Sequence, residues 1–304
     1  MIELKQAERG LYSRGFGGDT LNTAIYLARL GVAVDYITAL GDDPLSDEMI
    51  AGWAAEGVGT GRVARLKGKL PGLYMIQTDE FGDRRFFHWR ENSAVRCLMD
   101  LPETGDVLDS LASYEVVYLS AITLSIYSAQ GRTKLLRALH RARKHGARIA
   151  FDTNFRARGW PDPEIARAVF DEAFAASDMV LASTEDLLPL YPDQSDEQLM
   201  ARMPCSEVVL KRLRPGSIVR SEGVSLAVSA EPVIGPVVDT TAAGDSFSAA
   251  YIAARLAGAE AGEAARAGHR LGGVVVGYSG AIIPRSAMPA NMLADLASSR
   301  KAAR

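Results

Sequence analysis

The sequence predicts an α/β protein built on a doubly wound, mostly parallel sheet with helices on both faces. Short β-branched runs alternate with helical patterns through the second half of the chain, which is typical of strands joined by crossover helices. The length of 304 residues and the hydrophobic content of 48% are enough for a sizeable core. In the stretch 237–250, a β-branched run ends in a turn of small residues and a helical pattern follows. This stretch predicts a strand, a tight turn and the start of a helix.

The overall composition excludes several classes of function. A net charge of −3, with both signs interspersed, gives no basic face for nucleic acid. The two cysteines, Cys97 and Cys205, lie far apart, so neither a disulfide framework nor a zinc site is indicated. No apolar run reaches the roughly 18 to 20 residues of a membrane span, and the first residues lack a basic-then-apolar leader pattern. We therefore expect a cytoplasmic protein that acts on small molecules, with neither nucleic acid nor membrane as a partner.

The chain begins with a short strand and a glycine-rich run that leads into a helix. Residues 1–4 have the pattern of the last part of a strand, and the run 14–22 precedes a helical pattern that ends near Gly31. Two interpretations of the run remain open. It is either a loop with Asp19 or Thr20 as the helix cap, or a backbone that a ligand approaches closely.

The next segment predicts a strand, a helix and a hairpin. Residues 32–39 form the strand pattern, and Ser46 is the expected N-cap of the helix. The buried side of that helix would comprise Met49, Ile50 and Trp53. Residues 73–78 and 85–90 are strand-like runs joined by turn residues 79–83, which predicts a hairpin.

The second strand of the hairpin carries a polar face. Alternation places Phe86, His88 and Arg90 on one side and Phe87 and Trp89 on the other. On its own, such a face is more typical of a solvated sheet surface than of a binding site.

The second half of the chain contains four short β-rich runs, at 116–120, 148–152, 179–182 and 208–211, with a helical pattern at 134–145. In a parallel sheet the carboxyl ends of the strands meet at one edge, where binding sites gather. Each run ends in, or is followed by, polar residues. We therefore expect functional residues at that edge.

The turn at 242–245 has the chemistry of an anion site. Ala242, Ala243 and Gly244 leave room for the N–H groups of a helix N-terminus to face a phosphate. Asp245 would then be placed to take a proton from a hydroxyl that attacks this phosphate. On spacing alone, an ordinary helix start with Asp245 as a cap explains the pattern equally well.

The segment Asp239–Phe247 resembles the D-T-x-[GA]-A-G-D-x-F signature of the ribokinase-like (PfkB-type) carbohydrate kinases. The resemblance extends over nearly the whole chain in the same order, and it implies an ATP- and Mg²⁺-dependent kinase with a single domain over residues 1–304. In that family an inserted β-sheet closes over the sugar as a lid, here expected from about 1–15 and 60–93. Members usually begin with a longer strand, so the resemblance also implies residues upstream of Met1.

The resemblance also assigns roles to individual residues. In catalysis it implies that Asp245 is the base, that Ala242, Ala243 and Gly244 form the anion hole, and that Arg156 of the run Asp152–Arg156 bridges phosphate and substrate. The implied sugar-binding residues are Gly17, Gly18, Asp19, Asn22, Tyr74, His88, Arg90, Arg156 and Asp245. The implied ATP-binding residues are Asn154, Ser183, Lys211, Gly216, Ala242, Ala243, Gly244 and His269. Asp186 would help to hold Mg²⁺ through water, and a monovalent cation is a further candidate.

Several positions depart from the family pattern. Ala242 stands where many members have glycine, which matters only if that position needs a positive φ. Leu213 replaces the first glycine of the K-x-G-x-x-G nucleotide segment, and Ser183 and Asp186 replace an Asn and a Glu. His88 stands where tyrosine is usual, so affinity for the sugar is predicted to vary with pH.

The expected substrate is a sugar acid. The segments 70–74 and 87–90 resemble the lid of those family members that phosphorylate 2-keto-3-deoxygluconate on its primary hydroxyl. A carboxylate held under a lid needs a matching cation, which Arg90 can supply as a bidentate partner. The alternatives are another sugar kinase of the family, such as a fructokinase, or a non-catalytic relative that binds a sugar acid. Analogy with paired lids implies a homo-oligomer.

Overall fold

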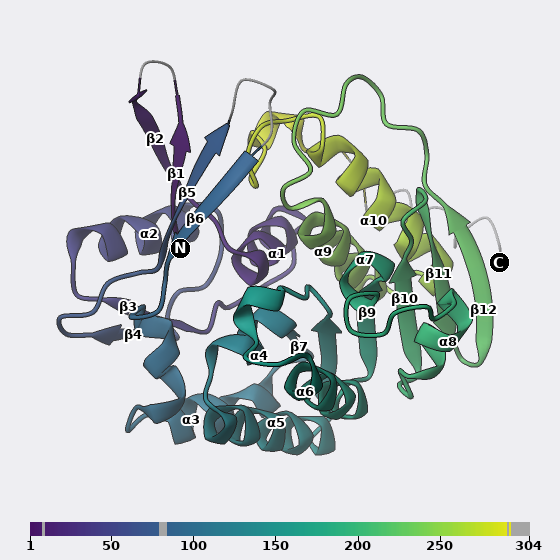
Figure 1. The fold of residues 1–304 in the computed structure, drawn as a ribbon, viewed down its shortest axis with the longest axis horizontal. Helices are drawn as coiled ribbons and strands as arrows, with labels where there is room; N and C mark the ends of the chain where they lie inside the picture. Colours follow the sequence, from purple (N-terminus) through teal and green to yellow (C-terminus); the bar gives the residue numbers. More distant parts are fainter. Residues whose placement is uncertain (8–9, 79–83, 291, 293–304) are drawn as a thin grey trace. The chain divides into compact units, whose positions relative to one another are not determined.

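The computed structural model describes residues 1–7, 10–78, 84–290 and 292. They form two compact units, Met1–Thr104 (unit 1) and Gly105–Arg304 (unit 2), which are described separately (Figure 1). The predicted hairpin turn at 79–83 and the basic tail at 298–304 lie outside the described residues.

Unit 1 contains a four-stranded sheet in the order β2-β1-β5-β6. The strands are β1 (Ile2–Gln6), β2 (Tyr12–Phe16), β5 (Leu73–Thr78) and β6 (Arg84–Trp89). β1 pairs antiparallel with β2 and parallel with β5, and β5 pairs antiparallel with β6. The strands predicted at 73–78 and 85–90 and their antiparallel pairing are confirmed. The sheet includes the first residues of the chain, and its role as a lid stays a prediction.

The other elements of unit 1 are α1 (Asp19–Arg29), β3 (Thr38–Gly41), α2 (Pro44–Ala55), β4 (Val63–Leu66) and the 3₁₀ helix η2 (Ala94–Asp100). β3 and β4 form a two-stranded parallel sheet. The prediction of a strand over 32–39 is wrong for most of its length, because β3 begins at Thr38. In the preceding residues the backbone bonds locally around Gly59, where the Gly59 N–H donates to Val34 O and the Tyr36 N–H to Gly59 O.

The predicted N-caps of both helices are also wrong. The N-cap of α1 is Gly18 and not Asp19 or Thr20. The N-cap of α2 is Asp43 and not Ser46. The Asp43 carboxylate accepts two backbone N–H groups of the first turn, and Pro44 fits the first helical position because its fixed φ matches the helix. Ser46 lies inside α2 and donates to Asp43 at 2.6 Å.

Unit 2 is built on a six-stranded sheet in the order β12-β11-β10-β9-β8-β7. The strands are β7 (Val116–Ser120), β8 (Arg148–Asp152), β9 (Met179–Ser183), β10 (Glu207–Lys211), β11 (Gly216–Ser221) and β12 (Val224–Ser229). β7 to β10 are parallel, and β11 and β12 are antiparallel additions at one side. The four strands predicted for the second half are therefore confirmed, within one residue at each end.

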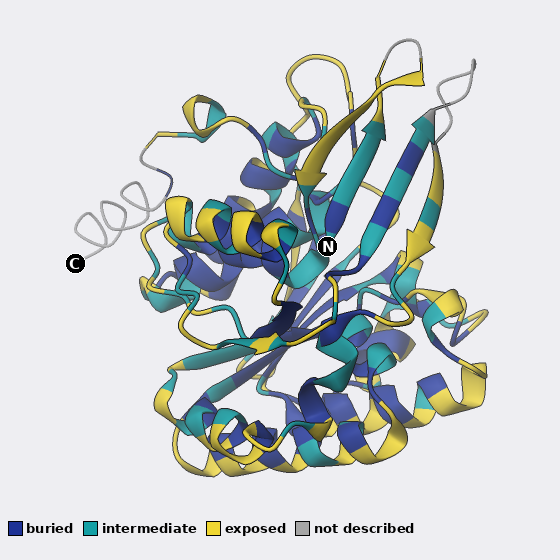
Figure 2. Cartoon of the chain, turned by 90° about the vertical axis from the view of Figure 1, so that its left-hand side faces the viewer, coloured by how far each residue is buried: buried dark blue, intermediate teal, exposed yellow. Residues whose placement is uncertain are grey.

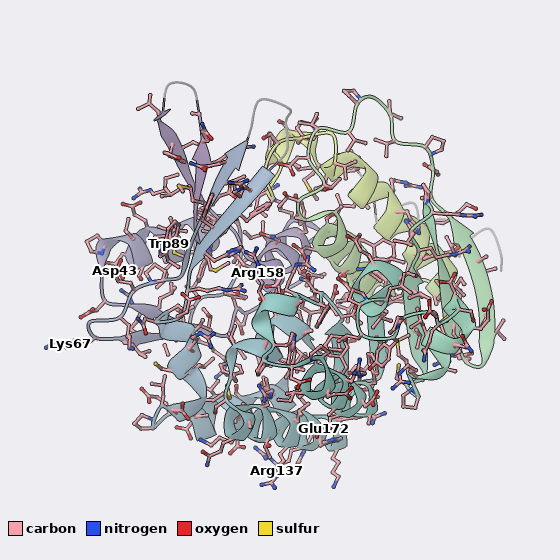
Figure 3. All side chains as sticks on the ribbon, viewed as in Figure 1. Asp43, Lys67, Trp89, Arg137, Arg158 and Glu172 are labelled. Atoms are coloured by element: carbon pink, nitrogen blue, oxygen red, sulfur yellow. The ribbon has the colours of Figure 1, made fainter. Side chains whose placement is uncertain are left out.

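Helices cover both faces of this sheet. α5 (Ala129–Lys144) and α6 (Pro163–Ala176) contact β8, whereas α10 (Ala261–Val275) contacts β11 and β12 on the opposite face and packs against α9 (Ala243–Leu256) (Figure 1). Figure 2 shows these helices buried on the side that faces the sheet and exposed on the other. Arg137 of α5 and Glu172 of α6, labelled in Figure 3, point away from the sheet. α5 begins five residues before the predicted 134, because Ser128 caps it.

The remaining helices are short: α3 (Thr104–Asp109), η3 (Ser110–Ser113), α4 (Ala121–Ile126), η4 (Ala157–Gly159), α7 (Thr184–Leu187), α8 (Asp196–Ala201) and η5 (Arg285–Ala287). Across the described part of the chain, no helix combines the length and the apolar character needed to cross a membrane.

The strand predicted immediately before the small-residue turn is absent. Val237 and Val238 are 59% and 47% exposed, and they lie in an irregular segment that follows β12. The N–H groups of Val238 and Asp239 both donate to Val276 O, just beyond α10. A backbone that bonds to the end of a helix cannot also join a strand ladder, so the β-branched pattern is overridden here.

Candidate active site

In unit 1 the glycine-rich run meets strand β5. A Cβ added to Gly17 would lie 2.6 Å from Tyr74 Oη, so only glycine lets the tyrosine hydroxyl approach the backbone there. The same point lies 3.7 Å from Asn22 Oδ1, which accepts the Gly18 N–H at 3.4 Å. The structure therefore brings these predicted sugar-binding residues together, with Tyr74 as the group that approaches the glycine backbone, and sugar binding there stays a prediction.

Tyr74 lies in a row with two other side chains on the same sheet. The pairing register places Glu3, Tyr74 and His88 beside one another on β1, β5 and β6. The Tyr74 hydroxyl donates to the Glu3 carboxylate, and the His88 ring stacks on the Tyr74 ring with centroids 6.1 Å apart. Sequence reasoning missed Glu3. Strand alternation in residues 1–4 was the available signal, but the pattern does not say which strand β1 pairs with.

The positions of Asp19 and Arg90 say less about a sugar site than that of Tyr74. Asp19 is the first residue of α1 and is half-buried. Arg90 directly follows β6, and its Cβ would lie 3.2 Å from a Cβ added to Gly72, so its stem packs over glycine backbone. Their roles at the sugar stay predictions.

The predicted phosphate turn starts helix α9 in unit 2. Ala242 has a φ of +61° and the helix begins at the next residue, with Asp245 half-buried in its first turn. Asp239, which is 3% exposed, fixes the turn: its carboxylate accepts the N–H of Thr241 at 2.9 Å and that of Gly280 at 2.8 Å. The signature aspartate at 239 thus orders the backbone around the turn, a role that sequence reasoning did not assign.

Lys211, the last residue of β10, brings a cation to this turn. Its Nζ lies 3.5 Å from the position of a Cβ added to Gly244 and 5.6 Å from the ring centroid of Phe247. It is also 3.7 Å from Asp152 Oδ2, at the end of β8, where the Asn154 N–H donates to the other carboxylate oxygen at 3.2 Å. The predicted nucleotide residue Lys211 and the predicted anion hole are therefore neighbours.

The residues after β8 and β9 also meet. Asp186 accepts hydrogen bonds from Thr153 Oγ1 at 3.1 Å and Arg156 Nη1 at 3.2 Å, and the Ser183 N–H donates to Thr153 Oγ1 at 3.2 Å. Burial and, after it, the negative charge of Asp152 raise the pKa of Asp186. The structure thus joins the two segments in which Arg156, Ser183 and Asp186 were predicted.

The departure at Leu213 is accommodated by the loop between β10 and β11. Leu213 is 66% exposed, and it is not among the described non-glycine residues with positive φ. Gly216, by contrast, has a φ of +132°, and a Cβ there would lie 2.8 Å from Val228 O. The loop therefore needs the glycine that is present, and it has space and ordinary backbone geometry for the leucine.

His269 of α10 lies beside the same cluster. Its ring meets the edge of the Phe247 ring with centroids 4.9 Å apart, and Nε2 is 3.0 Å from Ser217 Oγ. Burial and the nearby charge of Lys211 lower the pKa of His269 to about 4. The imidazole is therefore neutral at physiological pH. Its predicted role beside ATP stays a prediction.

Asp186 was predicted to help hold Mg²⁺, and this role stays a prediction. It is largely buried, and carboxylate oxygen is a ligand type that Mg²⁺ prefers. Within residues 1–7, 10–78, 84–290 and 292, no group of three or more His, Cys, Asp or Glu residues could hold a metal ion by itself. This donor set fits an ion that takes most of its ligands from phosphate and water.

The sheet of unit 2, the helices on both of its faces and the small-residue turn that carries Asp245 match the pattern of a ribokinase-type carbohydrate kinase. Residues 5–288 match the pfkB family carbohydrate kinases, and the chain belongs to that family.

Two relatives named 2-dehydro-3-deoxygluconokinase are similar over almost the whole chain. The protein from Dickeya dadantii is 41% identical over 300 residues, and that from Escherichia coli K12 is 41% identical over 301 residues; each alignment covers 95% of this chain and 96% of the relative. Among solved structures, a 2-dehydro-3-deoxygluconokinase from Thermotoga maritima has a TM-score of 0.82 and 21% identity, covering 98% of this chain and 97% of the other. The structural likeness supports the fold.

Proposed function

We propose that this protein transfers the γ-phosphoryl group of ATP to the primary hydroxyl of 2-keto-3-deoxygluconate (2-dehydro-3-deoxygluconate), giving 2-keto-3-deoxy-6-phosphogluconate and ADP. The observation that carries the chemistry is the turn at the start of α9, where helix N–H groups, Asp245 and the Lys211 ammonium lie together. The names of the relatives at 41% identity support the choice of substrate.

In the proposed reaction Asp245 removes the proton of the substrate hydroxyl while its oxygen attacks the γ-phosphorus. The bond from that phosphorus to the bridging oxygen of ADP breaks, and the ADP oxygen takes the electron pair. The N–H groups at the start of α9 and the ammonium of Lys211 face the negative charge on the transferring group. No covalent phosphoenzyme is formed.

Arg156 and Asp186 are proposed to act together beside this turn. Arg156 is 56% exposed at its side chain and donates to Asp186, so its guanidinium is oriented yet accessible to phosphate and substrate. Mg²⁺, when bound, neutralises charge on the ATP phosphates. Asp186 would hold that ion through water.

The residues of unit 1 are proposed to bind the sugar acid. Gly17, Asn22 and Tyr74 provide backbone and polar groups suited to a polyol. The choice of an acid rests on Arg90, since a desolvated carboxylate must be matched by a cation and a neutral sugar needs only hydrogen bonds.

His88 makes binding of an anionic substrate sensitive to pH. Protonation of an imidazole adds a positive charge, which favours an anionic substrate. We expect the KM for the sugar acid to fall a few-fold as the pH drops from about 8 to 5.5. The variant His88→Tyr should show a flatter profile in the same steady-state assay, and a flat KM in the unmodified protein would contradict the assignment.

We further propose that the protein works in the cytoplasm as a homo-oligomer. The outer strands of the four-stranded sheet carry exposed apolar side chains, among them Tyr12 (37%), Phe86 (38%) and Trp89 (55%). Exposed apolar groups on edge strands favour pairing with another copy. Sedimentation equilibrium of the unmodified protein and of Trp89→Lys tests this proposal. If the unmodified protein is monomeric at micromolar concentration, the proposal is refuted.

The function is tested by ADP release from Mg-ATP with 2-keto-3-deoxygluconate, gluconate, fructose or ribose as acceptor. Turnover confined to the keto-deoxy acid, and lost in Asp245→Asn, is the expected result. Faster turnover of fructose would make the protein a fructokinase. Calorimetric binding of the keto-deoxy acid without any turnover would make it a non-catalytic relative.

A further inference from the structure

We propose that Asp152 is a positioning residue of this kinase: it holds the ammonium of Lys211 against the phosphate turn, and the transferring phosphate is stabilised by the lysine so placed. The inference rests on the phosphate site proposed above and adds a residue to which no role in the reaction was assigned. It follows from the surroundings of Asp152, the geometry of its ion pair and its connection to α9.

Asp152 is held from several sides. It is 3% exposed, and Oδ2 accepts hydrogen bonds from Ser248 Oγ at 2.7 Å and from the Tyr118 hydroxyl at 3.1 Å. Oδ1 accepts the Asn154 N–H at 3.2 Å. A carboxylate with both oxygens engaged has little freedom to rotate, so it offers a fixed negative charge at the end of β8.

One of these partners belongs to the helix that starts at the phosphate turn. Ser248 is fully buried and lies in α9, three residues after Asp245. Its hydrogen bond therefore ties the end of β8 to the first turns of α9. The distance between the fixed carboxylate and the turn is set by this link, and with it the place of any cation that pairs with the carboxylate.

The cation is Lys211, and its pairing with Asp152 is loose. The Nζ to Oδ2 distance of 3.7 Å is that of an ion pair, longer than a hydrogen bond, so Asp152 attracts the ammonium without engaging its N–H groups. The same Nζ lies 3.5 Å from the Cβ position on Gly244. Asp152 thus attracts the lysine, whose charge also interacts with Asp186, and the ammonium remains able to donate to an anion at the turn.

Electrostatics explains why the lysine needs this partner. The Lys211 side chain is only 17% exposed, and it lies near the positive end of the α9 dipole, where the ammonium is repelled and little water screens the repulsion. A fixed carboxylate nearby offsets this repulsion. Without Asp152 the ammonium would be less favourable at the turn before ATP binds, and the phosphate would lose part of its stabilisation.

Glu207 provides a matched control. It lies at the first residue of β10, of which Lys211 is the last, and it is a buried carboxylate paired with Arg255 at 2.8 Å. Its substitution removes a buried ion pair from the same strand without touching the phosphate turn. A purely structural role for Asp152 predicts that the two substitutions behave alike.

The experiment compares Asp152→Asn, Asp152→Glu and Glu207→Gln in the full chain, by thermal unfolding and by kcat and KM for ATP and for the sugar acid. We expect Asp152→Asn to lower kcat/KM for ATP by at least about tenfold, with the KM for the sugar acid within about twofold. Asp152→Glu, which keeps the charge, should recover part of the loss. Glu207→Gln should lower the melting temperature and leave both KM values unchanged.

Lys211→Met tests whether Asp152 acts through the lysine. The double variant Asp152→Asn/Lys211→Met should be no slower than Lys211→Met alone, because the carboxylate then has no cation to position. Additive losses would overturn the proposal, and so would an Asp152→Asn variant with normal kcat and KM for ATP. If Asp152→Asn does not fold, Ser248→Ala and Tyr118→Phe each remove one hydrogen bond and should shift the same kinetic constants in the same direction.

Calorimetric titration of ATP separates this proposal from the proposed substrate. If no acceptor is phosphorylated, ATP affinity still reports on the pair: a loss in Asp152→Asn but not in Glu207→Gln supports the role of Asp152. Equal affinities in these variants would refute it.

Discussion

The two ends of β10 carry buried ion pairs of different construction. At the amino end, the Glu207 carboxylate accepts from Arg255 at 2.8 and 3.0 Å and from the Tyr251 hydroxyl at 2.7 Å, in a closed network. At the carboxyl end, Lys211 and Asp152 face each other at 3.7 Å beside the turn that opens α9. A closed Arg–Glu network uses its donors within the fold. An open Lys–Asp pair leaves donors for a ligand, which matches the rule that sites form at the carboxyl ends of parallel strands.

The largest expected difference between the two ends of β10 is in kcat. Asp245→Asn removes the proposed base and should lower kcat about 10²- to 10⁴-fold, with both substrates still bound, because the amide cannot take the proton. ADP release under saturating substrates measures it. The matched change at the other end, Glu207→Gln, should leave kcat unchanged. Near-normal turnover in Asp245→Asn would contradict the proposed role of Asp245 as the base.

The second largest effect is a loss of stability, and it is expected at the amino end of β10. Glu207→Gln should lower the free energy of unfolding by about 3 kcal/mol, because Arg255 and the Tyr251 hydroxyl remain buried with a weaker partner. Urea unfolding followed by circular dichroism measures the change. A loss below about 1 kcal/mol would show that the amino-end network contributes little to the fold.

Acid should lower the stability of the fold through His269, which lies near the carboxyl end of β10. His269 has a folded-state pKa of about 4, below its ordinary value of about 6.5, because of burial and the charge of Lys211. Between these values the unfolded chain binds a proton that the folded chain does not. Stability is therefore full above pH 6.5 and falls as the pH drops towards 4, by no more than about 2 kcal/mol after allowance for partial exposure. Urea midpoints of the unmodified protein and His269→Gln measure it, and parallel pH profiles would contradict the role of His269.

The sequence predicted much of this arrangement and missed particular parts for physical reasons. The strands that end at Ser120, Asp152 and Lys211 followed from β-branched runs, because buried parallel strands carry that pattern. The strand expected at Val237 failed, since its N–H groups bond to the carbonyl of Val276 far along the chain. A local sequence pattern cannot predict a hydrogen bond to a residue so distant in the chain.

The site shows the same division. The family resemblance assigned Asp245, the turn before it and Lys211 to one site, and the structure places Lys211 beside that turn, whereas their roles stay predictions. The partners of Asp152 were out of reach, because Tyr118 and Ser248 come from β7 and α9, distant in sequence. Glu3 was missed for a similar reason, since its role depends on the pairing of β1 with β5. Spacing locates residues that act within one turn, whereas hydrogen-bonded partners across a sheet require the fold.

The smallest expected effect concerns strain in the phosphate turn. Ala242 has a φ of +61°, a left-handed conformation that costs a residue with a Cβ about 1–2 kcal/mol. Ala242→Gly relieves that strain and loses part of the gain to the greater freedom of glycine in the unfolded chain. We expect a net rise in the free energy of unfolding of about 0.5–1 kcal/mol.

Ala243→Gly is the matched control for this turn. Ala243 begins α9 and is not among the described residues with positive φ, so a glycine there relieves no strain. It should lower the free energy of unfolding by roughly 0.5–1 kcal/mol, opposite in sign to Ala242→Gly. Urea unfolding of the two variants side by side measures the difference. Equal shifts would mean that the turn stores no strain, and the contrast between the ends of β10 would then rest on their ion pairs alone.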